Sequence, residues 1–283
     1  LIDTAPGYGF GRSEEIVGRA LRAYGQRNKV YLATKAGLEW RDDGVYRNST
    51  PERLRQELDD SLRRLQTNYV DLYQVHWPDP LVPIEETAAT MARLLEEGRV
   101  RYAGVSNYAP DQLAAFQSTC HLQTHQPPYN LFERGIEQDV VPWCKQHKVG
   151  LLGYGALCRG LLSGRMTPDT SFEGDDLRKL DPKFKQPRYQ QYLAAVEALD
   201  RFAQESFGKR VLQLAVRWAL DQGIDVALWG ARRPDQLEAL SGVIGWSLPE
   251  GTKDKIHAIV SEHVLDPVGP QFMAPPPRPG VGV

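Results

Sequence analysis

The chain has 283 residues, a length that suits one closed α/β barrel of roughly 250 residues or two smaller domains. Its 34 basic and 36 acidic residues give a formal net charge of −2, so charge gives no reason to expect a nucleic-acid or anionic-membrane partner. No run of about 18 apolar residues is present, and we therefore expect no membrane-spanning helix. The composition is that of an ordinary globular protein.

The cysteines and the first residues of the chain indicate in which cellular compartment the protein works. Cys120, Cys144 and Cys158 show neither a CxxC pair nor the spacing of a metal site, so we expect reduced, buried thiols and a cytoplasmic location. The start, Leu1-Ile2-Asp3-Thr4, lacks the features of a signal peptide and resembles the end of a β-strand. We expect further residues upstream, contributing one strand and one helix.

Short β-branched runs alternate with helical patterns along most of the chain. The runs are apolar without alternation, as expected of parallel strands that are covered on both faces. We predict strands at Leu1 to Asp3, Val30 to Thr34, Val70 to Val75, Val100 to Val105, His121 to Gln126, Val149 to Tyr154 and Asp225 to Trp229.

The helices between these strands carry clear start signals. Thr50 followed by Pro51 is an N-cap with proline at the first helical position, and it precedes a stripe of leucines at spacings of three and four. A second helix is predicted from Pro83, with acidic residues in its first turn and a stop at Gly98. Later helices are predicted at Glu137 to His147, Tyr192 to Gln204, Val211 to Gln222, Pro234 to Leu240 and Pro249 to His263.

Repeated alternation of strand and helix predicts a parallel sheet, and with an upstream strand the count reaches the eight of a (β/α)8 barrel. We predict a single barrel domain over residues 1–283. The stretch from Ser163 to Gln190 is irregular, and so long a loop in a compact domain is functional or disordered. The tail from Asp266 to Val283 is rich in proline and glycine and ends the fold.

Four polar residues of different chemistry fall at or just after successive predicted strands. Asp3 closes the first, Tyr8 lies in the following loop, Lys35 follows the second, and His76 follows the third. Asp3, Lys35 and His76 each have an ordinary explanation when taken alone, as a turn former, a solvated amine and a packed imidazole. The carboxyl ends of barrel strands share one face, however, so the four side chains are expected to converge there.

These residues lie in motifs that resemble the aldo-keto reductase superfamily. The likeness begins with Asp-Thr-Ala-Pro-Gly-Tyr-Gly at residues 3–9, followed by Ser-Glu-Glu, and it continues in chain order to residue 237. Its later motifs are Ala-Thr-Lys at 33–35, Val-His-Trp-Pro at 75–78, Gly-Val-Ser-Asn-Tyr at 104–108, Gln-Pro-Pro-Tyr-Asn at 126–130, the loop at 153–162 and the loop at 230–237.

The resemblance implies NADPH-dependent reduction of an aldehyde or ketone on a (β/α)8 barrel. Tyr8 would be the general acid that protonates the carbonyl oxygen, and the ammonium of Lys35 would favour its phenolate form. Asp3 would pair with Lys35, and His76 would hydrogen-bond the carbonyl oxygen. The hydride would come from the nicotinamide ring.

The resemblance also implies a set of cofactor-binding residues. Ser106, Asn107 and Gln126 match positions that hold the nicotinamide carboxamide, and Tyr154 matches the aromatic that stacks on the ring. The positions matching the pyrophosphate loop are Gly155, Leu157, Arg159 and Gly160, and those matching the adenosine pocket are Gly230, Arg232 and Gln236. The irregular stretch after Gly160 would fold over the pyrophosphate as a strap.

A preference for NADPH is expected because Arg232 and Arg233 offer charge-assisted hydrogen bonds to the 2′-phosphate, whereas NADH remains a possible cofactor. Three departures from the family pattern bear on the cofactor: Gly155 and Ala156 replace a common Ser-Pro, Leu240 replaces a polar residue near the adenine, and Gln236 stands where some relatives have an arginine. There is no GxGxxG fingerprint, HExxH or GxSxG motif, so Rossmann dehydrogenases, zincins and α/β-hydrolases have no support.

Trp40, Trp77 and Tyr129 could form an apolar substrate wall, although burial under loops would explain Trp77 and Tyr129 equally well. The Trp-Gly-Ala-Arg motif at 229–232 and the tail at 266–276 resemble a bacterial branch that reduces bulky ketones, including detoxification of 3-keto mycotoxins. The alternative is a nucleotide-binding regulatory subunit on the same barrel, similar to the potassium-channel β subunits. The sequence leaves the oligomeric state open.

Overall fold

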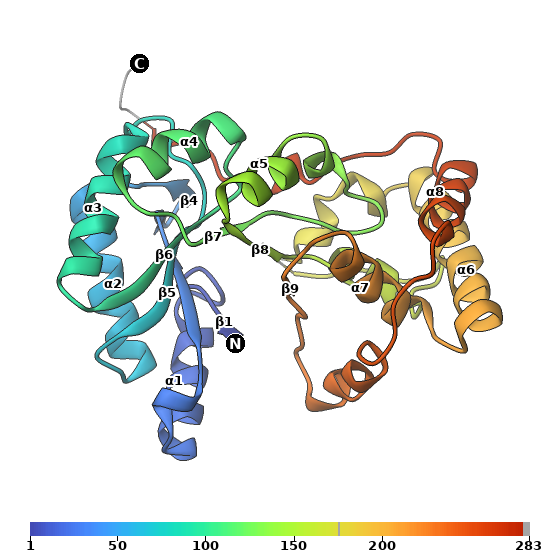
Figure 1. The fold of residues 1–283 in the computed structure, drawn as a ribbon, viewed down its shortest axis with the longest axis horizontal. Helices are drawn as coiled ribbons and strands as arrows, with labels where there is room; N and C mark the ends of the chain where they lie inside the picture. The colour runs from blue at the N-terminus through green and yellow to red at the C-terminus, as the bar shows by residue number, and fades with distance from the viewer. Residues whose placement is uncertain (175, 280–283) are drawn as a thin grey trace. The chain divides into compact units, whose positions relative to one another are not determined.

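The computed structural model of the chain describes residues 1–174 and 176–279 (Figure 1). Asp175, within the predicted irregular stretch, and residues 280–283 of the predicted tail lie outside these ranges. The chain forms two compact units. Unit 1 comprises Leu1–Gln126, Pro142–Gly150 and Ala274–Val283, and unit 2 comprises Pro127–Val141 and Leu151–Met273.

Unit 1 is built on parallel strands that follow one another in chain order. The strands β1 (Ile2–Asp3), β2 (Leu32–Ala36), β5 (Val70–Val75), β6 (Val100–Ser106) and β7 (Thr124–Gln126) each pair with the next, as predicted for a parallel sheet. The observed β5 has the predicted bounds. The observed β2 is displaced by two residues, so Lys35 lies inside the strand, opposite Gln74. The antiparallel hairpin of β3 (Leu38–Arg41) and β4 (Gly44–Arg47) was not predicted.

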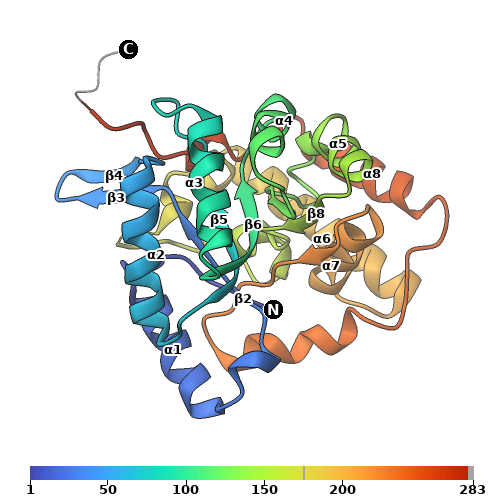
Figure 2. The same cartoon turned by 60° about the vertical axis from the view of Figure 1, so that its left-hand side comes forward.

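Helices connect these strands and cover one face of them (Figures 1 and 2). They are α1 (Arg12–Tyr24), α2 (Pro51–Leu65), α3 (Ile84–Glu96) and α4 (Pro110–Thr119), with a short 3₁₀ helix, η1 (Arg27–Lys29), before β2. Each helix packs against the next one along the chain, and α2 and α3 also contact β2 and β6, respectively. α1 and α4 were missed from the sequence.

Helix α2 shows how the sequence produces one of these elements. The side chain of Thr50 accepts a hydrogen bond from the backbone N–H of Arg53, and Pro51 occupies the first helical position. The predicted leucine stripe faces inward, with Leu54, Leu58 and Leu65 completely buried. Both the capping and the apolar stripe are therefore as predicted.

Unit 2 contains two short parallel strands, β8 (Gly150–Gly153) and β9 (Val226–Ala227), paired at Leu152 and Val226. Its long helices are α6 (Arg188–Phe207), α7 (Val211–Asp221) and α8 (Thr252–His263), and α6 contacts the other two. Helix α5 (Val140–His147) spans the boundary in sequence. The remaining elements are 3₁₀ helices: η2 (Gly135–Glu137), η3 (Cys158–Ser163), η4 (Leu177–Lys179), η5 (Pro182–Phe184), η6 (Pro234–Gly242) and η7 (Gln271–Met273).

The described residues therefore contain seven parallel strands joined by helices, the number visible in the sequence. Among the described residues of the predicted irregular stretch, short 3₁₀ turns are the regular structure before α6 begins at Arg188. The predicted helix from Pro234 is a 3₁₀ helix. The three cysteines are buried thiols, as expected. Within the described ranges, no helix combines the length and the apolar character needed to cross a membrane.

Candidate active site

The ammonium of Lys35 is the centre of a buried polar cluster in unit 1. Its side chain is only 1% exposed. Nζ lies 2.5 Å from Asp3 Oδ1, 3.1 Å from the carbonyl oxygen of Thr4 and 3.3 Å from Tyr8 Oη. An ammonium has three protons to donate, and these three acceptors can use all of them. Burial disfavours the charged form, but Asp3 and then Tyr8 outweigh it, so the pKa of Lys35 is raised.

The second carboxylate oxygen of Asp3 is held by two amides. Gln126 Nε2 donates to Asp3 Oδ2 at 2.9 Å, and Gln74 Nε2 donates to the same oxygen at 3.2 Å. Gln126 Nε2 also lies 3.3 Å from Gln74 Oε1. Asp3 is therefore fixed by hydrogen bonds on both oxygens, and its charge faces Lys35.

Buried carboxylates also support the strand that carries Lys35. Thr34 Oγ1 donates to Glu14 Oε1 at 2.6 Å, and the backbone N–H of Gly37 donates to Glu57 Oε2 at 2.6 Å. Gly37 has a φ of 90°, and a Cβ there would lie 2.9 Å from Ser49 Oγ, so glycine is required at this turn. These contacts fix the backbone on both sides of Lys35.

His76 also packs against Tyr8. The two rings meet edge to face, with centroids 6.1 Å apart. Burial, and secondarily the charge of Lys35, hold the pKa of His76 well below its usual value. The imidazole is therefore neutral at physiological pH, with one nitrogen able to donate a hydrogen bond. Tyr8 is 45% exposed, so its phenol is accessible from solvent.

The side chains of Ser106, the last residue of β6, and of Asn107, the next residue, are hydrogen-bonded to the strands and loops of the same cluster. Ser106 Oγ donates to the carbonyl oxygen of Gln126 at 2.7 Å. Asn107 Nδ2 lies 3.0 Å from both the carbonyl oxygen of His76 and Ser106 Oγ. Asn107 has a φ of 63°, a left-handed conformation that asparagine tolerates better than most residues. The structure thus brings together all seven site residues predicted within residues 1–126, apart from the tryptophans.

In unit 2, the predicted pyrophosphate loop is a tight left-handed turn. Gly155, Cys158, Arg159 and Gly160 all have positive φ, between 46° and 92°. The carbonyl oxygen of Gly155 accepts from Asn130 Nδ2 at 3.0 Å. Leu157 precedes the turn and packs against the small buried cluster around Val216. The backbone of Tyr154 pairs with Tyr129 and with the carbonyl oxygen of Pro127.

Arg159 points its guanidinium into a buried ion network. It bonds Glu133 Oε1 through Nη2 and Asp181 Oδ2, at 2.6 Å, through Nε. Lys183, fully buried, reaches Glu133 Oε1 at 2.8 Å. Two cations and two anions therefore balance here, and the positive charge of Arg159 is already neutralised.

The predicted adenosine segment follows β9. Gln236 Oε1 accepts from the backbone N–H groups of Arg232 and Arg233, at 2.7 and 3.2 Å. Arg233 forms a two-bond ion pair with Asp235. Gly230 and Arg232 are exposed just before η6. The pKa of Asp176 is lowered to about 2, chiefly by its hydrogen bond from Arg178, with a smaller contribution from the charge of Arg232.

The three predicted substrate-wall aromatics have different environments. Trp40, on β3, and Trp77, directly after His76, are both half-buried in unit 1. Tyr129 is 1% exposed, stacks on Trp218 at 4.9 Å, and donates to Glu137 Oε1 at 2.6 Å. These contacts favour the alternative explanation for Tyr129, burial as a packing residue.

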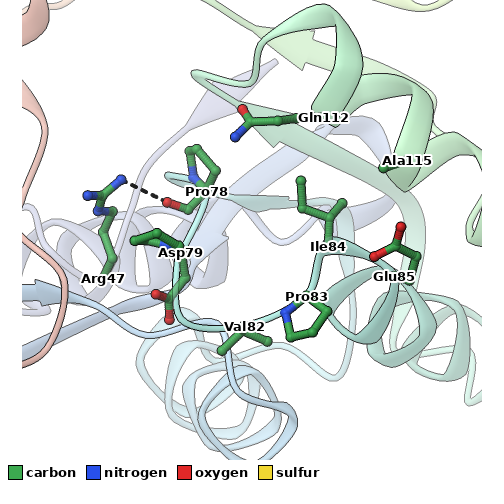
Figure 3. Close-up of a pocket in the computed structure, with 10 residues that line it drawn as sticks. Arg47, Pro78, Asp79, Val82, Pro83, Ile84, Glu85, Gln112 and Ala115 are labelled. Atoms are coloured by element: carbon green, nitrogen blue, oxygen red, sulfur yellow. Dashed lines mark hydrogen bonds between the residues drawn. The ribbon is translucent and has the colours of Figure 1, made fainter. Parts of the chain in front are cut away.

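A cavity of about 310 Å³ lies elsewhere in unit 1, between β4, the loop after β5 and α4 (Figure 3). Arg47 Nη1 donates to the carbonyl oxygen of Pro78 at 3.0 Å on one wall. The lining residues are Arg47, Pro78, Asp79, Pro80, Val82, Pro83, Ile84, Glu85, Gln112 and Ala115. Asp3, Tyr8, Lys35 and His76 are not among them, so the cavity is separate from the polar cluster.

Sequence reasoning missed Gln74 and Phe10. Gln74 lies on β5, two residues before His76, which directly follows that strand. The period of two along an extended chain directs both side chains to the same face. That spacing is a signal that could have identified Gln74. Phe10 lies beside Trp40, and no motif in the sequence marks it.

Known proteins resemble this chain over most of its length. The sequence model of the aldo/keto reductase family matches residues 1–261. The chain belongs to the aldo/keto reductase family. Aldo-keto reductase YhdN of Bacillus subtilis (strain 168) is 56% identical over 279 residues, which cover 98% of this chain and 84% of that protein. The NADH-specific methylglyoxal reductase of Escherichia coli (strain K12) is 32% identical, over 84% of this chain and 76% of that protein.

Among solved structures, the glycerol dehydrogenase of Gluconobacter oxydans superposes with a TM-score of 0.87 at 49% identity, covering 97% of this chain and 84% of that one. Aldo/keto reductases fold as parallel (β/α)8 barrels, so the predicted fold class is confirmed. The chain is an oxidoreductase of a family that reduces carbonyl compounds with a nicotinamide cofactor.

Proposed function

We propose that this aldo/keto reductase reduces an aldehyde or ketone to an alcohol with NADPH, and that Tyr8 is the general acid. The observation that carries the proposal is the position of Lys35 Nζ, 3.3 Å from Tyr8 Oη and 2.5 Å from Asp3 Oδ1. A phenol is a weak acid at neutral pH, and a neighbouring ammonium stabilises the phenolate that remains after proton transfer. Tyr8 is also the exposed member of the cluster.

Each residue of the cluster has one task in this proposal. Tyr8 Oη delivers its proton to the carbonyl oxygen of the substrate. Lys35 stabilises the resulting phenolate, and Asp3 keeps the ammonium charged and in place despite its burial. His76, held neutral, donates a hydrogen bond to the same carbonyl oxygen and orients it. The nicotinamide, when bound, supplies the hydride to the carbonyl carbon.

The residues present in each unit fit a nicotinamide dinucleotide. In unit 1, Ser106, Asn107 and Gln126 offer hydroxyl and amide groups suited to a carboxamide. In unit 2, Tyr154 offers an aromatic ring, and the turn through Gly155, Leu157, Arg159 and Gly160 has backbone φ values that let a phosphate approach closely. Because two carboxylates neutralise Arg159, its contribution to phosphate binding would come from its backbone.

The preference for NADPH rests on Arg232. Its guanidinium is exposed near the start of η6, next to Gly230 and Gln236, where a 2′-phosphate could accept charge-assisted hydrogen bonds. No acidic residue occurs in residues 230–234 that would repel this phosphate. NADH would also be used, with lower affinity; the Escherichia coli relative is named for NADH specificity.

For the substrate, we propose a ketone or aldehyde with a bulky apolar part. Trp40 and Trp77 would form the wall that contacts it, and 3-keto mycotoxins are one candidate class, so that the reaction would serve detoxification. The relatives named for methylglyoxal and glycerol represent the competing class of small polar substrates.

The test compares wild type, Tyr8→Phe and the control Tyr24→Phe, an exposed tyrosine at the end of α1. NADPH oxidation is followed with a panel of aldehydes and ketones, and cofactor affinity is measured separately. Tyr8→Phe should lose about 10² to 10⁴-fold in kcat with cofactor affinity unchanged, whereas Tyr24→Phe should retain full activity. If Tyr8→Phe kept more than about a tenth of kcat, the assignment would be wrong. Tight NADPH binding without turnover by wild type would instead favour a regulatory subunit.

A further inference from the structure

Phe10 combines two unfavourable features in one residue. It is 61% exposed, although it is a large apolar side chain. It also has a φ of 50°, in the left-handed region that L side chains rarely occupy, between Gly9 at 61° and Gly11 at 94°. Its neighbours in this left-handed run are both glycines, which adopt the conformation without strain.

Neither feature is explained by folding. An exposed phenylalanine contributes little burial to the core, and a third glycine would relieve the backbone strain of the turn. Residues held in a strained conformation concentrate at ligand-binding and catalytic sites, where the surrounding structure imposes the strain. Phe10 lies two residues after Tyr8, whose phenol is itself accessible.

The strained turn directs Phe10 toward Trp40. The two rings meet at 61° with centroids 5.9 Å apart. The guanidinium of Arg53 lies 5.4 Å from the Trp40 ring and is itself fixed by two hydrogen bonds to the carbonyl oxygen of Leu38. Arg53 lies on α2, so Trp40 packs against a guanidinium that joins this helix to β3, and Phe10 adds an exposed aromatic surface to Trp40.

Phe10 and Trp40 lie close in the chain to the two residues of the proposed chemistry, Tyr8 and Lys35. Phe10 follows Tyr8 by two residues, and β3, which carries Trp40, begins three residues after Lys35. Phe10 lies in the same turn as Tyr8, whose backbone carbonyl accepts from Ser13 N and whose N–H donates to Ala5 O, so Phe10 and the phenol belong to one short, hydrogen-bonded segment of the chain. Aromatic rings of this kind pack well against a planar or cyclic apolar group.

We propose that Phe10 is a substrate-selecting residue, which together with Trp40 receives an aromatic or similarly sized cyclic substituent of the carbonyl substrate. The inference rests on the proposed carbonyl reduction at Tyr8 and specifies its substrate class. It predicts that aryl aldehydes and ketones are preferred over short polar carbonyl compounds of equal reactivity.

The experiment uses phenylglyoxal and methylglyoxal, which share the reacting group and differ in a phenyl or a methyl substituent. The ratio of their kcat/KM values is measured for wild type, Phe10→Gly, Phe10→Asn and the control Tyr24→Ala. Tyr24 is also an exposed aromatic residue, at the far end of α1. Glycine and asparagine both tolerate positive φ, so both Phe10 variants should fold.

We expect Phe10→Gly and Phe10→Asn to lower the phenylglyoxal to methylglyoxal ratio by roughly 5 to 50-fold, because the loss of an apolar contact discriminates by about this factor. The change should arise mainly in KM for phenylglyoxal. Activity with methylglyoxal should stay within about twofold, as expected when contacts to one substituent are removed. Thermal unfolding of Phe10→Gly should occur at an unchanged or higher temperature, and Tyr24→Ala should keep the wild-type ratio.

An unchanged ratio in active Phe10 variants would overturn the selecting role and leave the proposed reduction intact. An equal loss for both substrates would also overturn it, because Phe10 would then act by positioning Tyr8. Absence of turnover by wild type with any carbonyl compound would refute the proposed reduction, and with it this inference.

Discussion

The ammonium of Lys35 donates a hydrogen bond to the phenol oxygen of Tyr8 over 3.3 Å, and the same nitrogen lies 4.9 Å from the centre of the Tyr8 ring. Both contacts place the positive charge of Lys35 against Tyr8. The cation is buried, and its pKa is nevertheless raised, because Asp3 and Tyr8 together compensate for the lost hydration. Lys35 therefore remains charged across the working pH range.

Replacing Lys35 with methionine should remove this stabilisation while keeping much of the volume. We expect kcat to fall about 10² to 10⁴-fold, as for loss of the acid itself, and the surviving pH–rate profile to move to higher pH. The measurement is kcat/KM as a function of pH. Lys35→Arg should restore little activity, because a planar guanidinium does not replace a compact ammonium. A pH profile identical to wild type in Lys35→Met would contradict the electrostatic role.

Arg232→Ala should weaken NADPH binding by roughly 10 to 150-fold, the value of one charge-assisted hydrogen bond. NADH affinity should hardly change, because NADH lacks the 2′-phosphate. Both affinities are measured by titration of the cofactor. Arg233→Ala is the matched control: its guanidinium is already paired with Asp235, so its loss should matter less. An equal decrease for both cofactors in Arg232→Ala would show that this residue does not recognise the 2′-phosphate.

His125 should make the protein sensitive to acid. Burial lowers its pKa to about 3, and Nε2 accepts a hydrogen bond from the backbone N–H of Tyr108. Below the unfolded value of about 6.5, the unfolded chain binds a proton that the folded chain refuses. The contribution of neutral His125 to the free energy of unfolding is therefore fully present above pH ~6.5 and is lost as pH falls toward 3.

His125→Gln removes this titration. Between pH 7 and 5, protonation linked to His125 should lower the free energy of unfolding of wild type by about 2 kcal/mol. The decrease in His125→Gln should be smaller than that in wild type by this amount. Urea unfolding at both pH values measures the difference. The control is His121→Gln, which changes an exposed histidine and should leave the pH dependence as it is. An equal loss in wild type and His125→Gln would show that His125 is protonated in the folded protein.

Gly18→Ala tests the close approach of α1 to α2. A Cβ at Gly18 would lie 2.4 Å from the carbonyl oxygen of Arg64 and 2.9 Å from the Cα of Leu65. Alanine is normally the better helix former, by about 1 kcal/mol. Overpacking against a backbone should outweigh this and destabilise the protein by about 1 to 3 kcal/mol in urea unfolding. Arg19→Ala, at the exposed neighbouring position, should change stability little. A more stable Gly18→Ala variant would mean that the helices are farther apart.

The sequence was informative where a signal is local. The apolar run of β5 and the cap and leucine stripe of α2 predicted these elements because their determinants lie within a few residues. Helix α1 was missed because its N-cap is Gly11, which has no side chain to cap the helix and therefore leaves no start signal in the sequence. The limits of β2 were displaced because pairing with β1 and β5 decides where that strand begins and ends.

The same distinction applies to the candidate site. The order of Asp3, Tyr8, Lys35 and His76 along successive strands was sufficient to predict their meeting. The buried partners of Arg159 were not predictable, since Glu133 and Asp181 approach it from separate segments of unit 2. Phe10 was missed because its significance comes from a backbone angle and an exposed surface, neither of which is visible in the sequence.

The hydrogen bonds to Asp3 fix the orientation of two amide side chains in the site. A carboxylate can only accept hydrogen bonds, so Gln74 and Gln126 must both turn their nitrogens toward Oδ2. This leaves the oxygen of Gln126 as the atom that can take a further partner, and that partner must be a donor. With the nicotinamide carboxamide bound there as proposed, its NH₂ group would face Gln126, and a planar ring anchored in this way would present one of its two faces to the substrate. One aspartate near the start of the chain would thereby contribute to the stereochemistry of the product.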